Sequence, residues 1–347
     1  MKKVVVGLSG GVDSSVAAYL LKEKGYEVIG VTMQVWQDDK ASNSKAIEDA
    51  QNVAKALSIP HFVVDFRKVF REKVIDYFVD EYMHARTPNP CIVCNRFIKW
   101  EALLDYADKI GAEYIATGHY AKIVQLENGR YSLLQSEGNA KDQTYALYRL
   151  TQEQLARTIM PVGEYTKEQI RYIANKAGIP VANKADSQEI CFIPDDDYAK
   201  YIEEYTGNTF EKGNFVDKDG NILGKHNGII HYTIGQRKGL NLAMGRPVFV
   251  TDIKVLENEV VIGEAEDVFS DTLEARDVNY MSIADLKEPI KATAKIRYSH
   301  KPVACTVTKL DEDTIKVVFD EPVRAITKGQ AVVLYDNNYV LLGGTIV

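Results

Sequence analysis

The sequence predicts an α/β protein: a doubly wound parallel-sheet domain followed by a small β-rich central domain and a C-terminal β-barrel. Three observations support this prediction. Short β-branched runs alternate with helical periodicity up to about residue 120, polar helical periodicity dominates residues 151–185, and short alternating strands with Gly turns fill the chain beyond Thr206. Alternating strands and helices are typical of parallel sheets, and closely spaced short strands are typical of barrels. We therefore expect domains at 1–205, 206–268 and 269–347.

The composition is that of a globular chain that buries a sizeable core. Its 347 residues are 46% hydrophobic and 26% charged, with a net charge of −7. We expect no signal peptide, and no apolar run approaches the roughly 18–20 residues that span a bilayer. Four cysteines suit a reducing, cytoplasmic compartment better than a disulfide framework. A nucleic-acid partner would have to meet a locally basic face of this acidic chain.

Hydrophobic periodicity predicts the elements of the first domain in order. They are strand 2–8, helix 16–21, strand 27–33, helix 46–57, strand 61–65, helix 70–83 and a strand that ends near residue 116. Ligands of such sheets bind beyond the C-terminal ends of the strands. The turn at 9–15, Met33 and Gly118-His119 all fall at that edge, so we expect a nucleotide site there.

The first turn has the composition of a phosphate cradle. Ser9-Gly10-Gly11-Val12-Asp13-Ser14-Ser15 joins the first strand to the first helix. Glycines let backbone N–H groups approach an anion, and the helix N-terminus adds the positive end of its dipole. The turn lacks the Lys-Ser/Thr of a Walker A loop and is not G-x-G-x-x-G. An ordinary strand–helix turn is the alternative.

A second focus is the segment 87–95, which contains Cys91 and Cys94. Prolines on both sides of Asn89 predict a stiff, exposed loop before a helix that resumes at Arg96. A cysteine at a junction between loop and helix gains thiolate character from the helix N-terminus. A reactive thiol is the favoured interpretation. A zinc knuckle, which would need further ligands, and a buried structural pair are the alternatives.

Cys191 is the third focus, in a polar-then-apolar loop at 186–194. Together with Cys94 it suggests two thiols that alternate through a disulfide. With Cys91 added, three thiolates could instead hold an iron–sulfur cluster, which remains an alternative. Cys305 lies in an alternating strand and is predicted to be structural.

The whole chain resembles one known family through six motifs. They occur in this order: Ser9-Gly10-Gly11-Val12-Asp13-Ser14, Thr87-Pro88-Asn89-Pro90 with Cys94-Asn95, Ala116-Thr117-Gly118-His119-Tyr120-Ala121, Lys141-Asp142-Gln143-Thr144-Tyr145, Ile190-Cys191-Phe192-Ile193 and Gly235-Gln236-Arg237-Lys238-Gly239-Leu240. The first is similar to the loop of the PP-loop ATP pyrophosphatases. Together they resemble the tRNA-specific 2-thiouridylases, which implies ATP-dependent thiolation of the wobble uridine, position 34, of tRNAs for lysine, glutamate and glutamine.

The resemblance also implies roles for individual residues. ATP would be held by Gly7, Leu8, Ser9, Gly10, Gly11, Val12, Asp13, Ser14 and Met33, with Gly118 near the adenosine. The target base would be lined by Asn89, Pro90 and Cys91. The catalytic residues would be Cys94, the nucleophile, and Cys191, the persulfide carrier. The tRNA would be contacted by His119, Lys141, Asp142, Gln143, Arg297, Tyr298 and Gln330.

The implied reaction adenylates the uracil C2 oxygen, after which a persulfide on Cys191 replaces it and a Cys94–Cys191 disulfide forms. Mg²⁺ is expected with ATP, although Asp13 is the only ligand that can be nominated. The sulfur donor would be a cysteine desulfurase or a sulfur-relay protein. Some relatives carry an aspartate where this chain has Cys91, which puts an acid–base role there in doubt. Residues 34–44 lack the acidic insert of many relatives.

A basic stretch of the C-terminal domain favours nucleic-acid binding. Residues 291–301 contain Lys291, Lys295, Arg297 and Lys301 with no acidic residue, although a solvated strand face is an equally simple interpretation. The alternative functions are another PP-loop synthetase that adenylates a small carbonyl compound, and an RNA- or metal-binding module without turnover. The paired cysteines argue against the first and the intact phosphate-cradle motif against the second.

Overall fold

The computed structural model describes residues 1–36, 42–135, 141–185, 190–193, 195 and 197–347. Part of the predicted Cys191 loop, residues 186–189 and 194, lies outside the described residues, as does residue 196. The same holds for residues 37–41 of the segment that lacks the acidic insert.

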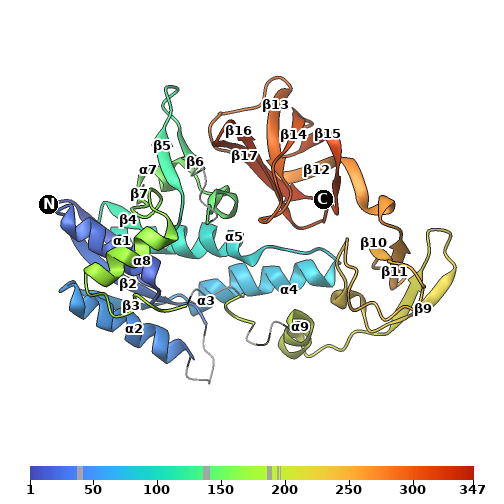
Figure 1. Ribbon diagram of the computed structural model, residues 1–347, viewed down its shortest axis with the longest axis horizontal. Helices are drawn as coiled ribbons and strands as arrows, with labels where there is room; N and C mark the ends of the chain where they lie inside the picture. Colours follow the sequence, from blue (N-terminus) through green and yellow to red (C-terminus); the bar gives the residue numbers. More distant parts are fainter. Residues whose placement is uncertain (37–41, 136–140, 186–189, 194, 196) are drawn as a thin grey trace.

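Five parallel strands in the order β3-β2-β1-β4-β7 form the sheet of the N-terminal domain (Figure 1). They are β1 (Lys3–Gly7), β2 (Glu27–Gln34), β3 (His61–Asp65), β4 (Tyr114–Ala116) and β7 (Thr158–Ile159). The strand order reverses between β1 and β4, so the loops after these two strands border the crevice where doubly wound sheets bind ligands. The predicted fold class is confirmed.

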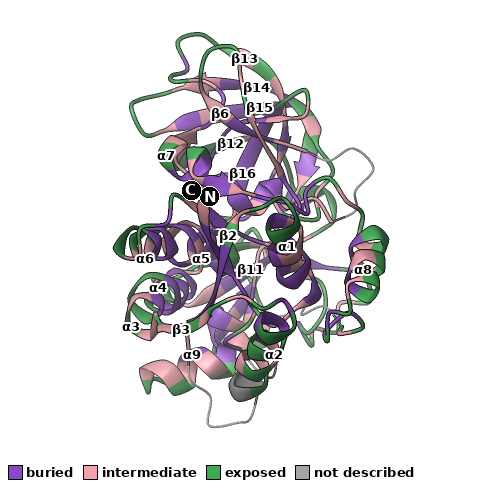
Figure 2. Ribbon diagram, turned by 90° about the vertical axis from the view of Figure 1, so that its left-hand side faces the viewer, coloured by how far each residue is buried: buried purple, intermediate pink, exposed green. Residues whose placement is uncertain are grey.

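Helices cover both faces of this sheet, which explains why its central valines, Val4 to Val6, are fully buried (Figure 2). One face packs against α1 (Val12–Glu23), α2 (Ser42–Ala56) and α8 (Lys167–Lys176). The other side carries two helices that each contain a π-helical turn. The first runs through α3 (Arg67–Phe70), η1 (Arg71–Ile75) and α4 (Asp76–Met83), and the second through α5 (Pro90–Cys94), η2 (Asn95–Ala102) and α6 (Leu103–Lys109).

The start of α5 corrects the loop predicted around the two prolines. Pro90 occupies the first helical position, where its missing N–H is no loss, and the Asn89 side chain caps the helix by accepting from Cys91 N at 3.1 Å. Cys94 therefore lies within a continuous helix and not at a junction between loop and helix. Helix formation is also sparser than predicted at 151–185, which contains α7 (Gln152–Ala156), β7 and α8.

The central β-rich domain follows α9 (Tyr198–Thr206). Its four strands are ordered β10-β11-β8-β9, with bounds β8 (Gly213–Val216), β9 (Ile222–His226), β10 (Phe249–Lys254) and β11 (Glu259–Gly263). Phe215 and Val250 are fully buried at its centre. This domain thus has its own small core.

Six antiparallel strands close into the predicted C-terminal barrel through the pairing of β12 with β17. They are β12 (Phe269–Tyr280), β13 (Ile290–Lys295), β14 (Val303–Lys309), β15 (Ile315–Arg324), β16 (Ala331–Asp336) and β17 (Tyr339–Ile346). β13 ends before Arg297 and Tyr298, so both residues lie in the bend and turn that follow this strand.

A hairpin of the N-terminal domain extends the barrel sheet, which the sequence did not reveal. Its strands are β5 (Lys122–Gln125) and β6 (Tyr131–Leu134), and Leu134 pairs with Tyr339 of β17. Arg130 of the hairpin donates to the carbonyl oxygens of Met281 at 3.0 Å and Tyr280 at 2.7 Å. The first and last domains therefore share one hydrogen-bonded sheet.

The three domains meet at Thr87, three residues before α5; we call this point the Thr87 junction. Thr87 N donates to Lys328 O at 2.8 Å, and its carbonyl oxygen accepts from Gln330 Nε2 at 2.7 Å. Its hydroxyl contacts the hydroxyl of Thr233 at 3.2 Å. The same residue thus contacts the barrel and the central domain. In the part of the chain that the structure describes, no helix is long and apolar enough to cross a membrane.

Candidate functional site

A cavity of about 390 Å³ opens beyond the C-terminal ends of β1 and β4; we call it the cradle cavity. Predicted residues on its wall are Gly7, Ser9, Gly11, Val12, Asp13, Ser14, Met33, Gly118, His119, Lys141 and Gln143. Thr117 and Tyr120, which also line the wall, belong to the motif at 116–121 but had no predicted role, and the sequence analysis did not single out Lys99, Lys184 and Ala185. The cavity therefore brings together the nucleotide residues predicted from three separate segments.

Close backbone packing forms the floor of this cavity. Gly10 has a φ of +70°, which favours glycine, and a Cβ there would lie 2.5 Å from Ala46 O. A Cβ on Gly118 would lie 2.5 Å from Ser14 N, so the loop after β4 can rest on the start of α1 only with glycine at this position. The first N–H groups of α1 have no intrahelical partner, and Gly11 supplies no side-chain cap. Such N–H groups suit phosphate oxygens.

Some predicted ATP residues support the cradle without lining it. The Leu8 side chain is buried and reaches within 2.5 Å of where a Cβ on Gly30 would lie. The carbonyl oxygen of Gly10 accepts from Lys184 Nζ at 3.0 Å. The hydroxyls of Ser9 and Ser14 contact each other at 3.2 Å, so these side chains stabilise the turn as well as facing the cavity.

Two lysines hold the loop through ion pairs. Lys167 Nζ lies 2.8 Å from both carboxylate oxygens of Asp13, and Tyr120 donates to the same carboxylate at 2.6 Å. Lys184 Nζ contacts Asp49 Oδ2 at 2.6 Å. Neither lysine has a local sequence signal, because each pairs with an aspartate more than 130 residues away.

The residues of the cradle fit a triphosphate better than they fit a dedicated metal site. Among the described residues, no three His, Cys, Asp or Glu side chains converge to hold a metal ion. Asp13, the nominated magnesium ligand, is already bonded by Lys167 and Tyr120. A Mg²⁺ that enters with ATP is therefore expected to be coordinated mainly by phosphate oxygens and water.

Three cysteines lie within electrostatic range of one another, and Lys99 of the cradle cavity acts on two of them. The pKa of the Cys94 thiol is raised to about 12, first by burial and then by the charges of Cys191 and Cys91, while Lys99 opposes the rise. Burial also raises the pKa of Cys191, and Cys91 adds to the rise. Residues Cys91 and Cys191 are exposed as a whole, although the surroundings of the Cys191 sulfur are desolvated enough to raise its pKa, and none of the three cysteines is in a disulfide. The expected thiolate character of Cys94 is wrong for this state, because burial outweighs the helix N-terminus.

The proposed base-binding residues lie at the start of α5. Pro90 is buried, and the side-chain oxygen of Asn89 is used to cap the helix. Cys91 is exposed, one helical turn before Cys94. A base that reached Cys94 would therefore contact the exposed first turn of α5.

His119, one of the residues expected to contact tRNA, lies inside the cradle cavity. Its Nδ1 is 2.8 Å from Thr117 Oγ1, and its ring centroid is 5.3 Å from that of Trp100. Burial, followed by the charge of Lys99, lowers its pKa well below 6.5. The side chain is thus neutral at pH 7.

The segment 141–143 connects the cradle cavity to the barrel. Lys141 and Gln143 line the cavity, and the Asp142 carbonyl oxygen accepts from Tyr298 OH at 3.0 Å. Lys295 Nζ lies 5.7 Å from the ring centroid of Tyr298 and 5.8 Å from that of Tyr145. Lys295 thus contacts one aromatic ring of the barrel, Tyr298, and one of the N-terminal domain, Tyr145.

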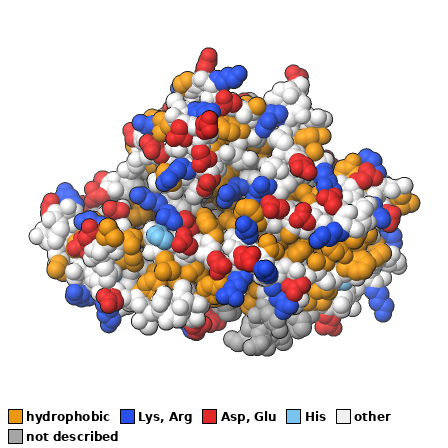
Figure 3. All heavy atoms as spheres, turned by 180° about the vertical axis from the view of Figure 1, so that it is seen from behind, with side chains coloured by type: hydrophobic (Ala, Val, Ile, Leu, Met, Phe, Trp, Pro, Cys, Tyr) orange, Lys and Arg blue, Asp and Glu red, His pale blue; other side chains and the backbone are white. Residues whose placement is uncertain are grey.

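The other expected tRNA contacts of the barrel take part in contacts between domains or within the barrel. Arg297 donates to Arg324 O at 3.0 Å, and Gln330 holds the Thr87 junction. Lys291, Tyr298 and Lys301 are exposed and form the accessible part of the basic stretch. The face seen in Figure 3 carries Lys and Arg interspersed with Asp and Glu, so positive charge does not dominate it.

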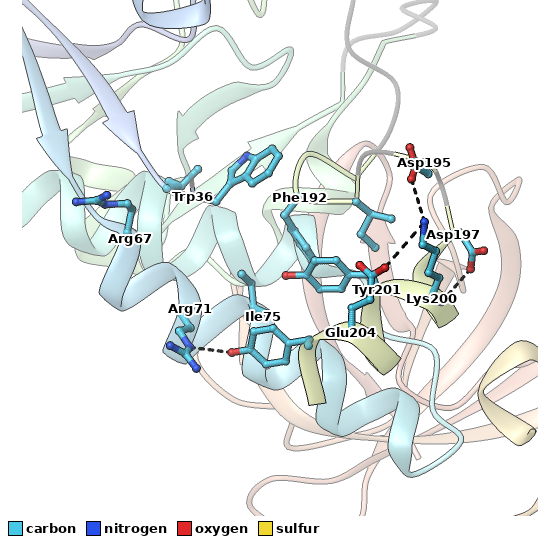
Figure 4. Close-up of a pocket in the computed structure, with 13 residues that line it drawn as sticks. Trp36, Arg67, Arg71, Ile75, Phe192, Asp195, Asp197, Lys200, Tyr201 and Glu204 are labelled. Atoms are coloured by element: carbon cyan, nitrogen blue, oxygen red, sulfur yellow. Dashed lines mark hydrogen bonds and ion pairs between the residues drawn. The ribbon is translucent and has the colours of Figure 1, made fainter. Parts of the chain in front are cut away.

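A second cavity of about 580 Å³ lies beyond Cys191; we call it the Trp36 cavity (Figure 4). Phe192, the neighbour of Cys191, forms one wall with Tyr201 of α9. Arg71 donates to Tyr205 OH at 2.9 Å, and Lys200 lies 3.6 Å from Asp195. Its cations have polar partners and no glycine loop occurs among the described residues that line it, so this lining does not have the features of a phosphate site.

Comparisons with known proteins agree along the whole chain. Residues 2–195 match the family model described as tRNA methyl transferase HUP domain, residues 199–264 the tRNA methyl transferase PRC-barrel domain, and residues 270–347 the aminomethyltransferase β-barrel domain.

Two curated relatives share its full length. The tRNA-specific 2-thiouridylase MnmA of Lachnoclostridium phytofermentans is 57% identical over 100% of both chains. The protein of the same name from Clostridioides difficile is 56% identical over 99% of this chain and 98% of its own. A 4-thiouridine synthetase in complex with RNA and ATP is 19% identical over 58% of this chain and 50% of that chain, with a TM-score of 0.39.

Proposed function

The chain belongs to the tRNA-specific 2-thiouridylase family, and we propose on that basis that it replaces O2 of the wobble uridine with sulfur. It is an ATP-dependent tRNA sulfurtransferase. The proposed targets are uridine 34 of tRNAs for lysine, glutamate and glutamine. The observation that supports this proposal best is the position of Lys99, which lines the cradle cavity and acts electrostatically on both Cys94 and Cys191.

In the first step, the uracil O2 attacks the α-phosphorus of ATP and the bond to pyrophosphate breaks. The carbonyl oxygen of uracil is a poor leaving group, and adenylation converts it into a good one. The uncapped N–H groups at the start of α1 would hold the phosphate oxygens while negative charge builds up on the leaving pyrophosphate. ATP is consumed here as a substrate, and the protein contributes positioning and backbone donors.

In the second step, the terminal sulfur of a Cys191 persulfide attacks C2 and the C2–O bond to AMP breaks. The Cys94 thiolate then attacks the inner sulfur of Cys191, which breaks the S–S bond of the persulfide and leaves sulfur on C2. A Cys94–Cys191 disulfide forms, so the two cysteines supply the two electrons that reduce the transferred sulfur. The two thiol protons leave to solvent and the phosphate products. A dithiol reductant must reopen the disulfide before the next turnover.

The partners follow from this chemistry. The tRNA would approach the side of the cavity where segment 141–143 meets Tyr298. A cysteine desulfurase or a sulfur-relay protein would load exposed Cys191 with sulfur. The cycle needs reduced thiols at its start, which favours the cytoplasm as the place of action.

Nucleoside mass analysis tests the proposal. Cells that lack the protein are complemented with the wild type, Cys94→Ser, Cys191→Ser or Cys305→Ala, whose thiol lies in the barrel. We expect 2-thiouridine only with the wild type and Cys305→Ala. Full 2-thiouridine in the uncomplemented cells, or with either serine variant, contradicts the proposal. Iron and zinc content of the anaerobically purified protein separates the persulfide route from a cluster route.

A further inference from the structure

Lys99 occupies a position that none of the sequence motifs singled out. It lies in η2, five residues after Cys94, and η2 is π-helical. A π-helix pairs residues i and i+5, and such turns often occur at functional sites. The π-turn therefore places Lys99 on the wall of the cradle cavity, one turn from the cysteine.

The ammonium of Lys99 differs from those of the other lysines around the loop. Lys167 and Lys184 are held by Asp13 and Asp49 at 2.8 and 2.6 Å. Within the described residues, Lys99 makes neither a hydrogen bond nor an ion pair, although it is half-buried. A partly buried charge without a protein partner is costly unless a ligand or a reacting group supplies the opposite charge.

The charge of Lys99 acts on groups that we assign to both half-reactions. Its charge acts on the thiols of Cys94 and Cys191 and on the His119 ring. The Cys91 and Cys191 thiols raise the pKa of Cys94, whereas the positive charge of Lys99 lowers it. His119 is neutral at pH 7, so it adds no positive charge beside Lys99.

We propose that Lys99 is a catalytic residue that serves both half-reactions. Its ammonium pairs with the phosphate of the bound nucleotide and stabilises the thiolate of Cys94 when that sulfur attacks Cys191. The role of Lys99 at the Cys94 thiolate rests on the proposed function. Its effects on nucleotide binding and on the reactivity of the Cys94 thiol can both be measured without turnover.

The test compares Lys99→Met, Lys99→Arg and Lys109→Met. Lys109 is an exposed lysine of α6 outside the cavity and serves as the matched control. Titration calorimetry measures ATP affinity, and pulses of iodoacetamide followed by peptide mass analysis measure the alkylation rate of Cys94 between pH 8 and 10. Circular dichroism confirms that each variant is folded.

We expect Lys99→Met to weaken ATP binding about tenfold and to slow Cys94 alkylation about three- to tenfold, because the nucleotide phosphate and the Cys94 thiolate each lose a nearby positive charge. Lys99→Arg restores both in part, and Lys109→Met changes neither. Unchanged ATP affinity or unchanged alkylation in folded Lys99→Met overturns the inference, as does an equal effect of Lys109→Met. If the wild type makes no 2-thiouridine, the proposed function fails, while both measurements still decide the role of Lys99.

Discussion

Burial sets the resting state of the Cys94 thiol. Cys94 lies in a helix that packs against apolar side chains such as Phe192, and its thiol has a pKa of about 12. An ordinary cysteine titrates near 8.5. The folded protein therefore keeps Cys94 protonated at pH 7, and the thiolate forms only when positive charge or solvent reaches the sulfur.

This state predicts slow alkylation of Cys94. At pH 8 we expect iodoacetamide to modify Cys94 at least about a hundredfold more slowly in the folded protein than in urea, because only the thiolate reacts and its fraction falls more than about a thousandfold, partly offset by the greater nucleophilicity of a high-pKa thiolate. Its rate in the folded protein should rise with pH toward 12, since the folded pKa is raised. Mass analysis of the peptides measures this, with exposed Cys91 as the internal reference. Similar rates for Cys94 in both states would show that burial does not protect it.

Residues of the site differ in how far sequence could identify them. Gly10 and Gly118 were predictable, because their motifs require close backbone approach and the structure shows it. Lys99, Lys167 and Lys184 were not, since each becomes part of the site only through the π-turn or through aspartates distant in sequence. Cys94 was proposed as a reactive thiol, but its protonation was predicted with the wrong sign because burial depends on tertiary packing.

Local signals explain which elements could be predicted. The strand, turn and helix from β1 to α1 are specified within about twenty residues, so they were found. Pro90 was interpreted as a helix breaker, although at the first helical position it favours a helix. The hairpin β5–β6 was missed because its partner strand, β17, lies about 200 residues later in the sequence.

The hairpin predicts a stability effect at the element scale. Replacing Arg130 by Met removes its hydrogen bonds to Met281 O and Tyr280 O and should lower the free energy of unfolding by about 1–3 kcal/mol. Urea denaturation followed by fluorescence measures this change. Glu127→Gln, an exposed position on the same hairpin, is the control and should be neutral. Equal midpoints for Arg130→Met and the wild type would show that these bonds do not hold the domains together.

At the scale of the whole molecule, the Thr87 junction sets how the barrel faces the catalytic domain. Three contacts of one residue reach Lys328, Gln330 and Thr233 in the other two domains. The junction lies just before α5, so the geometry of the cysteines and the orientation of the barrel are connected through a few residues of backbone.

We expect Gln330→Ala to weaken binding of full-length tRNA about tenfold, because it loses a short hydrogen bond to Thr87 O that fixes the barrel. Binding of the isolated anticodon stem–loop and of ATP should change little, since we propose that both contact mainly the catalytic domain. Fluorescence anisotropy with the two RNAs measures the difference. An equal loss for both RNAs would instead indicate that Gln330 acts at the anticodon.

The pairing of β6 with β17 also restricts how this architecture can be rearranged during evolution. A catalytic domain that lost its barrel would present the β6 edge with unpaired N–H and C=O groups, which invites association with other chains. A barrel acquired from another gene would need a last strand that matches the register of Leu134 with Tyr339. The catalytic domain and the barrel are therefore expected to be inherited together and not exchanged as separate modules.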